Sequence, residues 1–366
     1  MQNRAKRNKR RRQASLITNI ISCMITLAAL TGCIVLVLQN YSLKNQSLEA
    51  TAQIEEYESF TADHIYTQAD VDAFMQEAAA DAKEEQKSEI LTDIKQRMAT
   101  GGSTAQMLRD YYPDDVVVYS DGQYNFFPIS DSLKQHNYVY DNFVLNEESG
   151  EMAYVDDTDV VLSKKGIDVS KHQGRIDWEK VAADGVEYAF IRAGFRGSSE
   201  GALVEDEYFK KNIEGALEND IEVGIYFYTQ ALDEEEAIEE AEFVLELTKD
   251  YDITYPIVFD IEEPTSNSAR TADMTKEDYT AATLAFCKII SEAGYEPMIY
   301  GNLKTFMIML DMNQLEEYDK WFAYYNDHVY FPYEFGIWQY SSTGSIDGID
   351  GDVDMNVCMK EYGKAE

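Results

Sequence analysis

The stretch Ile257-Val258-Phe259-Asp260-Ile261-Glu262-Glu263-Pro264 decides how the second half of this sequence folds. Its apolar beginning is typical of a buried β-strand, and Pro264 breaks the chain two residues after Glu262. Because side chains two residues apart share one face of a strand, Asp260 and Glu262 should point the same way, with Cα atoms about 6.6 Å apart. The sequence therefore predicts two neighbouring carboxyl groups at the end of a buried strand.

Short apolar runs alternate with helical patterns from Lys165 onward. The expected strands cover residues 167–170, 188–193, 223–229, 257–261 and 297–300, and the expected helices cover residues 178–184, 204–219, 233–247 and 275–293. Beyond residue 300 the pattern is rich in strands, at residues 321–325, 335–340 and 352–355. This alternation predicts an α/β fold with a parallel sheet closed into a barrel, whose catalytic groups would lie at the C-terminal ends of the strands.

Acidic residues fall at those strand ends, with Asp168 in the first strand and Asp260 and Glu262 at the end of the fourth. Two carboxyl groups in a barrel mouth repel each other, which raises one pKa and keeps one acid protonated near neutral pH. Such a pair suits glycoside hydrolysis, in which one carboxyl donates a proton to the leaving oxygen and another stabilises positive charge. The alternative is a solvated acidic loop, since a chain with 68 acidic residues forms many chance pairs.

Seven motifs follow one another within residues 166–358. They are Gly166-Ile167-Asp168-Val169-Ser170 with Gln173-Gly174 and Ile176-Asp177-Trp178, then Ala189-Phe190-Ile191-Arg192-Ala193, Val223-Gly224-Ile225-Tyr226-Phe227-Tyr228, Phe259-Asp260-Ile261-Glu262, Trp321-Phe322-Ala323-Tyr324, Trp338-Gln339-Tyr340 and Val353-Asp354-Met355-Asn356. In this order they resemble glycoside hydrolase family 25, the N-acetylmuramidase lysozymes. Many members carry a histidine near Phe227-Tyr228, where this sequence has none.

The resemblance implies a TIM-like (β/α) barrel with fewer helices than strands over residues 164–366. It also implies cleavage of the β-1,4 bond between N-acetylmuramic acid and N-acetylglucosamine in peptidoglycan. Glu262 would be the general acid/base, and Asp260 would orient the substrate N-acetyl group, which attacks the anomeric carbon. Asp168 and Asp354 would be flanking carboxylates that hold geometry and charge.

By the same resemblance, six side chains would line the sugar groove: Tyr226, Tyr300, Trp321, Tyr324, Trp338 and Gln339. Aromatic faces pack against the apolar faces of sugar rings, and tyrosine hydroxyls can bond the sugar edges. The alternative for each aromatic residue is packing in the protein core.

The distribution of charge argues against a nucleic-acid-binding function. Residues 1–12 hold seven basic side chains, residues 13–43 are uncharged, and the other 323 residues carry 24 basic and 68 acidic side chains. A body this acidic repels phosphates. The four histidines are scattered, and neither C-x-x-C nor H-E-x-x-H spacing occurs, so the sequence predicts no metal site and no cofactor.

Residues 16–38 form an uncharged segment of 23 residues, which as a helix would be about 35 Å long and could cross a bilayer. The basic tail of residues 1–15 favours a cytoplasmic N-terminus, with the rest of the chain outside the cell membrane. Two alternatives are a cleaved signal peptide and a lipoprotein signal, because Leu30-Thr31-Gly32-Cys33 resembles a lipobox. Five apolar residues follow Cys33 and no A-x-A-like site follows the segment, which favours an uncleaved single-pass anchor.

Residues 39–103 are typical of a polar helical stalk, and a homodimer through this stalk is one alternative. Residues 104–163 predict a small α+β module or spacer, with a β-hairpin around Ser120-Asp121-Gly122. The leading hypothesis is a membrane-anchored cell-wall muramidase that acts on peptidoglycan glycan strands. The rivals are a non-catalytic wall-binding protein that uses the same barrel and a stalked scaffold that recruits partners.

Overall fold

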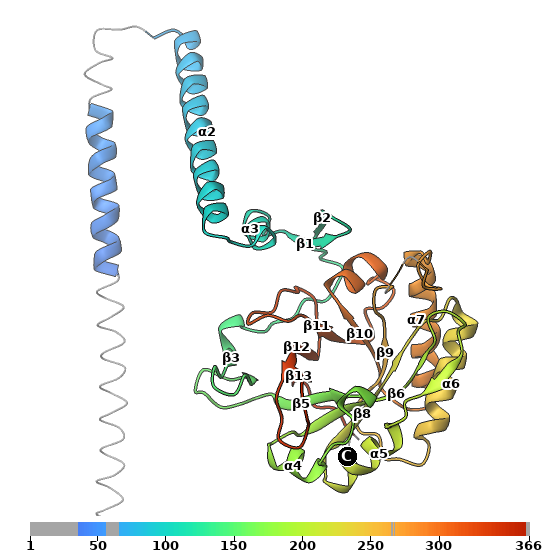
Figure 1. Cartoon of the computed structure of the whole chain (residues 1–366). Coiled ribbons are helices and arrows are strands. Elements are labelled where there is room, and N and C mark those ends of the chain that lie inside the picture. Colours follow the sequence, from blue (N-terminus) through green and yellow to red (C-terminus); the bar gives the residue numbers. More distant parts are fainter. Residues whose placement is uncertain (1–35, 56–65, 265, 267, 364–366) are drawn as a thin grey trace, which may run out of the picture. The chain divides into compact units, whose positions relative to one another are not determined.

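The computed structural model describes residues 36–55, 66–264, 266 and 268–363 (Figure 1). The chain divides into two compact units, one up to Lys95 and the other from Gln96. Residues 36–55 form a helix, and α2 (Gln68–Ala99) contains no buried residue. Among the described helices, none combines the length and the apolar character needed to cross a membrane. Most of the predicted membrane span, together with the basic tail, lies outside the described residues.

Eight strands of the second unit close into a barrel. In the order of their hydrogen bonding they are β5 (Lys164–Val169), β13 (Val353–Cys358), β12 (Ile337–Gly344), β11 (Asp319–Ala323), β10 (Pro297–Asn302), β9 (Ile257–Asp260), β8 (Glu222–Tyr228) and β6 (Tyr188–Arg196). The pairing of β6 with β5 closes the ring. β13 is antiparallel to both of its neighbours, and the other pairs in the ring are parallel. The predicted α/β barrel is therefore confirmed, with one antiparallel strand.

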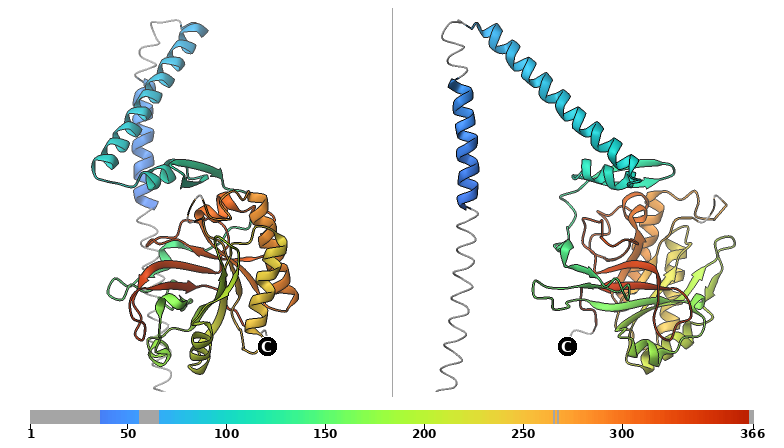
Figure 2. Two further views of the ribbon diagram at one scale, coloured as in Figure 1. Left: turned by 45° about the vertical axis from the view of Figure 1, so that its right-hand side comes forward. Right: turned by 60° about the vertical axis from the view of Figure 1, so that its left-hand side comes forward.

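Helices cover the barrel where the chain crosses between its earlier strands. They are α4 (Trp178–Ala183), α5 (Phe209–Glu218), α6 (Glu234–Thr248) and α7 (Lys276–Glu292), and the shorter η3 (Thr305–Met309) follows β10. α6 and α7 lie side by side on one flank of the barrel (Figures 1 and 2). In the described chain, β11, β12 and β13 follow one another without an intervening helix, so the helices of the barrel are fewer than its strands, as expected.

The sequence predicts a helix at residues 204–219, but the helix in the structure begins later than predicted. Residues Leu203–Glu205 form β7, which pairs with the end of β6, and α5 begins only at Phe209. Gly194 allows the close pairing, because a Cβ there would lie 2.3 Å from the carbonyl oxygen of Val204. Val204 fitted the helical period, but backbone pairing decided its structure.

Side chains alternate between the inside and the outside of the barrel, as strand geometry requires. One set fills the inside as an apolar cluster that includes Tyr188, Phe190, Val258, Met298, Trp321 and Ile337. Gly166 and Gly224 make room for two of these rings, because a Cβ would lie 2.1 Å from Tyr188 or 2.3 Å from Phe190. The neighbouring strand residues belong to the main core, where the helices pack. The inside of the barrel is therefore a packed core below its C-terminal mouth.

The segment before the barrel is an α+β module that packs on it. The module contains α3 (Thr104–Tyr111), the hairpin of β1 (Asp115–Ser120) and β2 (Gln123–Pro128), and the hairpin of β3 (Phe143–Leu145) and β4 (Met152–Tyr154). The predicted hairpin turn is confirmed, with positive φ at Asp121 and Gly122. Val116 and Val118 share the buried core of the barrel, so this segment is a packed module and not a free spacer.

Candidate active site

A pocket of about 420 Å³ opens at the C-terminal ends of the parallel strands. The four predicted carboxyl groups line it: Asp168 of β5, Asp260 at the end of β9, Glu262 just beyond that strand, and Asp354 of β13. The barrel thus brings together acids that lie far apart in the sequence. Their surroundings differ, and those differences decide what each carboxyl can do.

Asp168 is held by two amide groups. Gln339 Nε2 and Asn356 Nδ2 each donate a hydrogen bond to Asp168 Oδ2 at 2.8 Å. The hydroxyls of Tyr300 and Tyr325 donate to Gln339 Oε1 at 2.8 and 2.9 Å. In this network every hydrogen bond is donated in the direction of Asp168. The network therefore fixes the orientation of the amides and of the carboxyl.

Asp168 and Asp354 lie directly opposite each other on antiparallel strands. Like charges in such a pair are unfavourable, because the two Cβ atoms are only about 4.5–5.5 Å apart. Burial and the charge of Asp354 raise the pKa of Asp168 well above its ordinary value, although the two amide donors oppose this shift. Burial and the charge of Glu262 raise the pKa of Asp354 to about 6. The pair therefore holds a proton at pH values where exposed aspartates are ionised.

Asp260 and Glu262 occupy different depths of the pocket. Asp260 is 5% exposed, and its Oδ1 has no hydrogen-bond partner among the described residues. Burial, followed by the charges of Glu262 and Asp168, raises the pKa of Asp260 well above its ordinary value. Glu262 is exposed on the rim, but partial desolvation still raises its pKa. A deep carboxyl with an oxygen that no described residue contacts, beside a carboxyl of raised pKa at the mouth, is an arrangement that suits acid/base chemistry.

Arg192 of β6 also lines the pocket, although the sequence analysis did not select it. Arg192 Nε donates a hydrogen bond to Asp206 Oδ2 at 2.7 Å, and Arg192 Nη2 forms an ion pair with the same oxygen at 2.6 Å. The charge of Arg192 lowers the pKa of both Asp260 and Glu262, which opposes the effect of burial. Arg192 shares parity with Phe190, which the structure shows to face inward, so strand alternation places Arg192 at the pocket only once the direction of β6 is known.

Aromatic rings form the floor and the walls of the pocket. Trp321 is 1% exposed, stacks on Phe190 with ring centres 4.4 Å apart, and donates to Asn356 Oδ1 at 2.7 Å. The rings of Tyr226 and Tyr300 meet Trp321 edge-on. Four of the predicted groove residues therefore line the pocket, namely Tyr226, Tyr300, Trp321 and Gln339.

The other two predicted groove residues, Trp338 and Tyr324, do not line this pocket. Trp338 is fully buried, meets Phe143 edge-on, and donates to the carbonyl of Tyr324 at 2.8 Å. The Tyr324 hydroxyl accepts a hydrogen bond from Arg109 of α3. Strand alternation is the physical reason for Trp338: Gln339 faces into the barrel, so its neighbour must face outward.

Several further residues line the pocket without having been selected from the sequence as site residues. Besides Arg192, they are Ser170, His172, Gln173, Tyr228 and Tyr325. Tyr228 has the same parity as Tyr226 on β8, so alternation could have found it. The first three belong to a capped turn that includes η2 (Lys171–Gln173), in which Ser170 Oγ accepts from the His172 N–H and Gln173 Oε1 accepts from the Ser170 N–H. Because this turn is irregular, no periodic pattern in the sequence indicates that its residues line the pocket.

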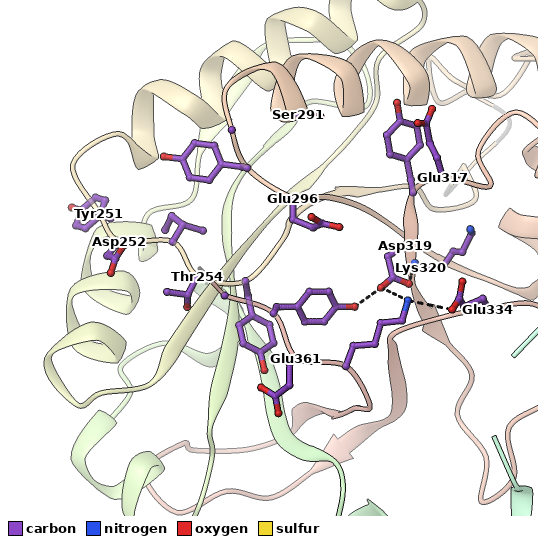
Figure 3. A pocket seen from close by; sticks show the side chains of 18 of the residues that line it. Tyr251, Asp252, Thr254, Ser291, Glu296, Glu317, Asp319, Lys320, Glu334 and Glu361 are labelled. Carbon is purple, nitrogen blue, oxygen red and sulfur yellow. Dashed lines mark hydrogen bonds and ion pairs between the residues drawn. The ribbon is translucent and has the colours of Figure 1, made fainter. Parts of the chain in front are cut away.

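A larger pocket, of about 880 Å³, lies at the opposite end of the barrel, around the N-terminal ends of the parallel strands (Figure 3). Its central acids already have partners. Asp319 accepts from the Tyr362 hydroxyl and pairs with Lys360 at 3.0 Å, and Glu334 pairs with Lys134 at 2.7 Å. In barrels of this type the C-terminal end carries the chemistry and the N-terminal end contributes stability. The smaller pocket is therefore the candidate active site.

A barrel that gathers carboxyl groups and aromatic rings at the C-terminal ends of its strands is the arrangement that glycoside hydrolases use. The profile of the family described as "Glycosyl hydrolases family 25" matches residues 167–349. This chain belongs to that family.

Individual relatives cover parts of the chain. It is 31% identical over 204 residues to the uncharacterized protein YegX of Escherichia coli strain K12, covering 52% of this chain and 68% of YegX. It is 24% identical over 198 residues to the autolytic lysozyme of Clostridium acetobutylicum, covering 52% and 55%. The modular autolysin LytC of Streptococcus pneumoniae, solved in complex with a synthetic peptidoglycan ligand, has 28% identity and a TM-score of 0.49. That match covers 66% of this chain and 57% of LytC.

Proposed function

We propose that this protein is a muramidase that cleaves the β-1,4 bond between N-acetylmuramic acid and N-acetylglucosamine in peptidoglycan. The observation that carries the proposal is the pair Asp260 and Glu262. A buried carboxyl, with an oxygen that no described residue contacts by a hydrogen bond, lies beside a carboxyl of raised pKa at the pocket mouth. Membership of family 25 supports the same chemistry, as does the name of the clostridial relative, an autolytic lysozyme.

Glu262 would act first as a general acid. Its raised pKa favours the protonated form, which can donate to the leaving glycosidic oxygen. As that C–O bond breaks, the carbonyl oxygen of the substrate acetamido group would form a bond to the anomeric carbon. Water then attacks the same carbon, the acetamido bond opens, and the Glu262 carboxylate takes up the proton of the water. This second step restores the protonated Glu262 and completes hydrolysis.

Asp260 would orient the acetamido group. The N–H of that group would supply the donor that Asp260 Oδ1 lacks among the described residues, and such a bond favours the ionised carboxylate. The carboxylate would then stabilise the positive charge that develops on the acetamido group. Asp168 and Asp354 would share a proton and so limit the negative charge around Asp260. Tyr226 and Tyr300 would contact the sugar.

We also propose that residues 16–38 anchor the protein in the cell membrane, with the N-terminus in the cytoplasm and the barrel outside. The support is in the sequence, where 23 uncharged residues follow a basic tail. Protease added to intact protoplasts should then release the barrel from the cells, and a protected barrel would contradict this topology. Dimerisation through residues 39–103 stays a prediction.

The test of the activity is the identity of the sugar ends that the protein creates. Full-length protein in detergent is incubated with peptidoglycan, the products are reduced with borohydride, and the reduced sugar is identified by mass. A muramidase yields reduced N-acetylmuramic acid, whereas cleavage of the alternate glycosidic bond yields reduced N-acetylglucosamine. Binding to peptidoglycan without new ends would support the rival hypothesis of a non-catalytic wall-binding protein.

A further inference from the structure

Glu262 is not held by the barrel sheet. β9 ends at Asp260, so Glu262 lies in the loop that follows the strand, on the exposed rim of the pocket. A general acid must be placed within hydrogen-bond reach of the leaving oxygen, and misplacement by about 1 Å can reduce the rate strongly. The contacts that fix this loop therefore matter for the reaction.

The residues on both sides of Glu262 are held by β10 and the turn that follows it. Ile261, which precedes it, donates through its N–H to the Tyr300 carbonyl at 3.2 Å and accepts from the buried Thr305 hydroxyl at 3.2 Å. Glu263, which follows it, accepts a hydrogen bond from Lys304 Nζ at 2.5 Å. Adjacent residues, Lys304 and Thr305, thus hold the side chain that follows Glu262 and the backbone that precedes it.

Lys304 also joins this loop to the β1–β2 hairpin. Its Nζ pairs with Asp121 Oδ2 at 3.3 Å, and Asp121 lies in the hairpin turn. Figures 1 and 2 show the hairpin next to the chain that follows β10. The charges of Glu263 and Asp121 raise the pKa of Lys304 against the effect of burial, so Lys304 stays charged. One ammonium group therefore bridges the hairpin and the loop of Glu262.

The hairpin is itself firmly anchored on the barrel. Val116 and Val118 are buried in the main core. The Tyr330 hydroxyl accepts from the Val117 N–H at 2.9 Å and donates to the Asp115 carbonyl at 3.1 Å. Because the hairpin is fixed on the barrel, its Asp121 can hold the Lys304 ammonium group in a defined position. The hairpin lies outside the segment that matches family 25, residues 167–349.

We propose that the β1–β2 hairpin, through the bridge Asp121–Lys304–Glu263, positions Glu262 for proton donation. The proposal rests on the function proposed above, in which Glu262 is the general acid. Lys304 and Asp121 are positioning residues, since neither lines the pocket. The module in front of the barrel thereby becomes a part of the catalytic apparatus.

This role has a characteristic kinetic signature. The bridge is partly exposed, with 76% of the Asp121 side chain and 51% of the Glu263 side chain accessible, so it contributes little to stability. Its loss should misplace the acid in the transition state without removing a contact to bound substrate. We therefore expect kcat to fall while KM and the melting temperature change little.

The experiment compares four variants of the full-length protein on peptidoglycan. Lys304→Met keeps the apolar stem but removes the ammonium, and Lys304→Arg restores a cation that can reach both carboxyls. Asp121→Asn removes only the hairpin charge, and asparagine tolerates the positive φ of this turn. Lys134→Met is the matched control, because Lys134 also joins the module to the barrel, through Glu334, but at the opposite end.

We expect kcat to fall roughly 10-fold in Lys304→Met and about 3-fold in Asp121→Asn, with Lys304→Arg within about 3-fold of wild type. Lys134→Met should leave kcat unchanged. The inference is overturned if Lys304→Met behaves like Lys134→Met, or if Asp121→Asn keeps the full kcat. A wild-type protein that creates no new reducing ends would instead refute the proposed function, so the two failures are distinguishable.

Discussion

The two ends of the barrel both hold polar pockets, but they differ in how their charges are satisfied. At the N-terminal end, Asp319 has two partners and Glu334 pairs with two lysines. At the C-terminal end, Asp168 faces Asp354 across two strands, and Asp260 has an oxygen without a partner in the described chain. The pocket in which these acids are paired is the larger of the two, at about 880 Å³ against about 420 Å³.

This difference in charge pairing, and not pocket size, distinguishes the candidate active site from the other pocket. Buried carboxyl groups without compensation reduce stability, and they are typical of sites that a substrate or a proton completes. Substitutions at the N-terminal end should therefore change stability alone, whereas substitutions at the C-terminal end should change activity and can increase stability.

The largest expected effect is that of Glu262→Gln, which keeps shape and hydrogen bonding but removes the transferable proton. Release of muropeptides should fall about 1000-fold, with the melting temperature and the binding of peptidoglycan preserved. The control is Glu361→Gln, an exposed glutamate of the N-terminal pocket, which should keep full activity. A folded Glu262→Gln protein with near-normal turnover would refute the assignment of the general acid.

The opposite end should respond in stability. Asp319→Asn removes the charge that Lys360 and the Tyr362 hydroxyl contact, so the melting temperature should fall by about 5 °C. The kcat/KM on peptidoglycan should stay within about 2-fold of wild type, because the proposed chemistry lies at the other end of the barrel. Differential scanning calorimetry and the muropeptide assay check the two halves of this prediction. A loss of activity without a loss of stability would contradict it.

Asp354→Asn should stabilise the protein at neutral pH. The folded pKa of Asp354 is raised to about 6, so its contribution to stability is fully present below the unfolded pKa of about 3.9 and is lost as the pH rises through 6. An asparagine side chain does not ionise in this pH range, so it causes no such loss of stability. The variant should therefore melt about 4 °C higher than wild type at pH 7.5, and the difference should vanish near pH 4. A lower melting temperature at pH 7.5 would show that Asp354 is compensated.

The smallest expected effects are those of substitutions at the adjacent residues Tyr324 and Tyr325. Tyr325 lines the pocket and donates to Gln339, so Tyr325→Phe should lower kcat/KM about 5-fold. Tyr324 faces Arg109, so Tyr324→Phe should leave kcat/KM within about 2-fold and lower the melting temperature slightly. If the two variants exchanged these effects, the directions assigned to the two side chains that follow β11 would be wrong.

Local patterns in the sequence determined the barrel and the positions of its acids. Runs with period 2 and period 3.6 distinguish strands from helices, and their alternation indicates parallel pairing. Asp168 and Asp260 could be placed in one pocket because the C-terminal ends of parallel strands meet at one edge of a barrel, however far apart they are in the sequence. Asp354, at the start of the antiparallel β13, was predicted there from the family resemblance alone. The turn at Asp121-Gly122 was equally local, since its residue types specify positive φ.

Only the tertiary structure decided which side of each strand faced inward. A barrel strand is buried on both sides, so Trp338 and Gln339 are both buried and no alternation of polarity shows their parity. Closure of the ring turned Gln339 toward Asp168 and Trp338 toward Phe143. The bridge from Asp121 to Lys304 joins residues 183 positions apart, and no local period encodes such a contact. Burial on both faces and long-range pairing are therefore the two physical reasons why the sequence alone could not complete the site.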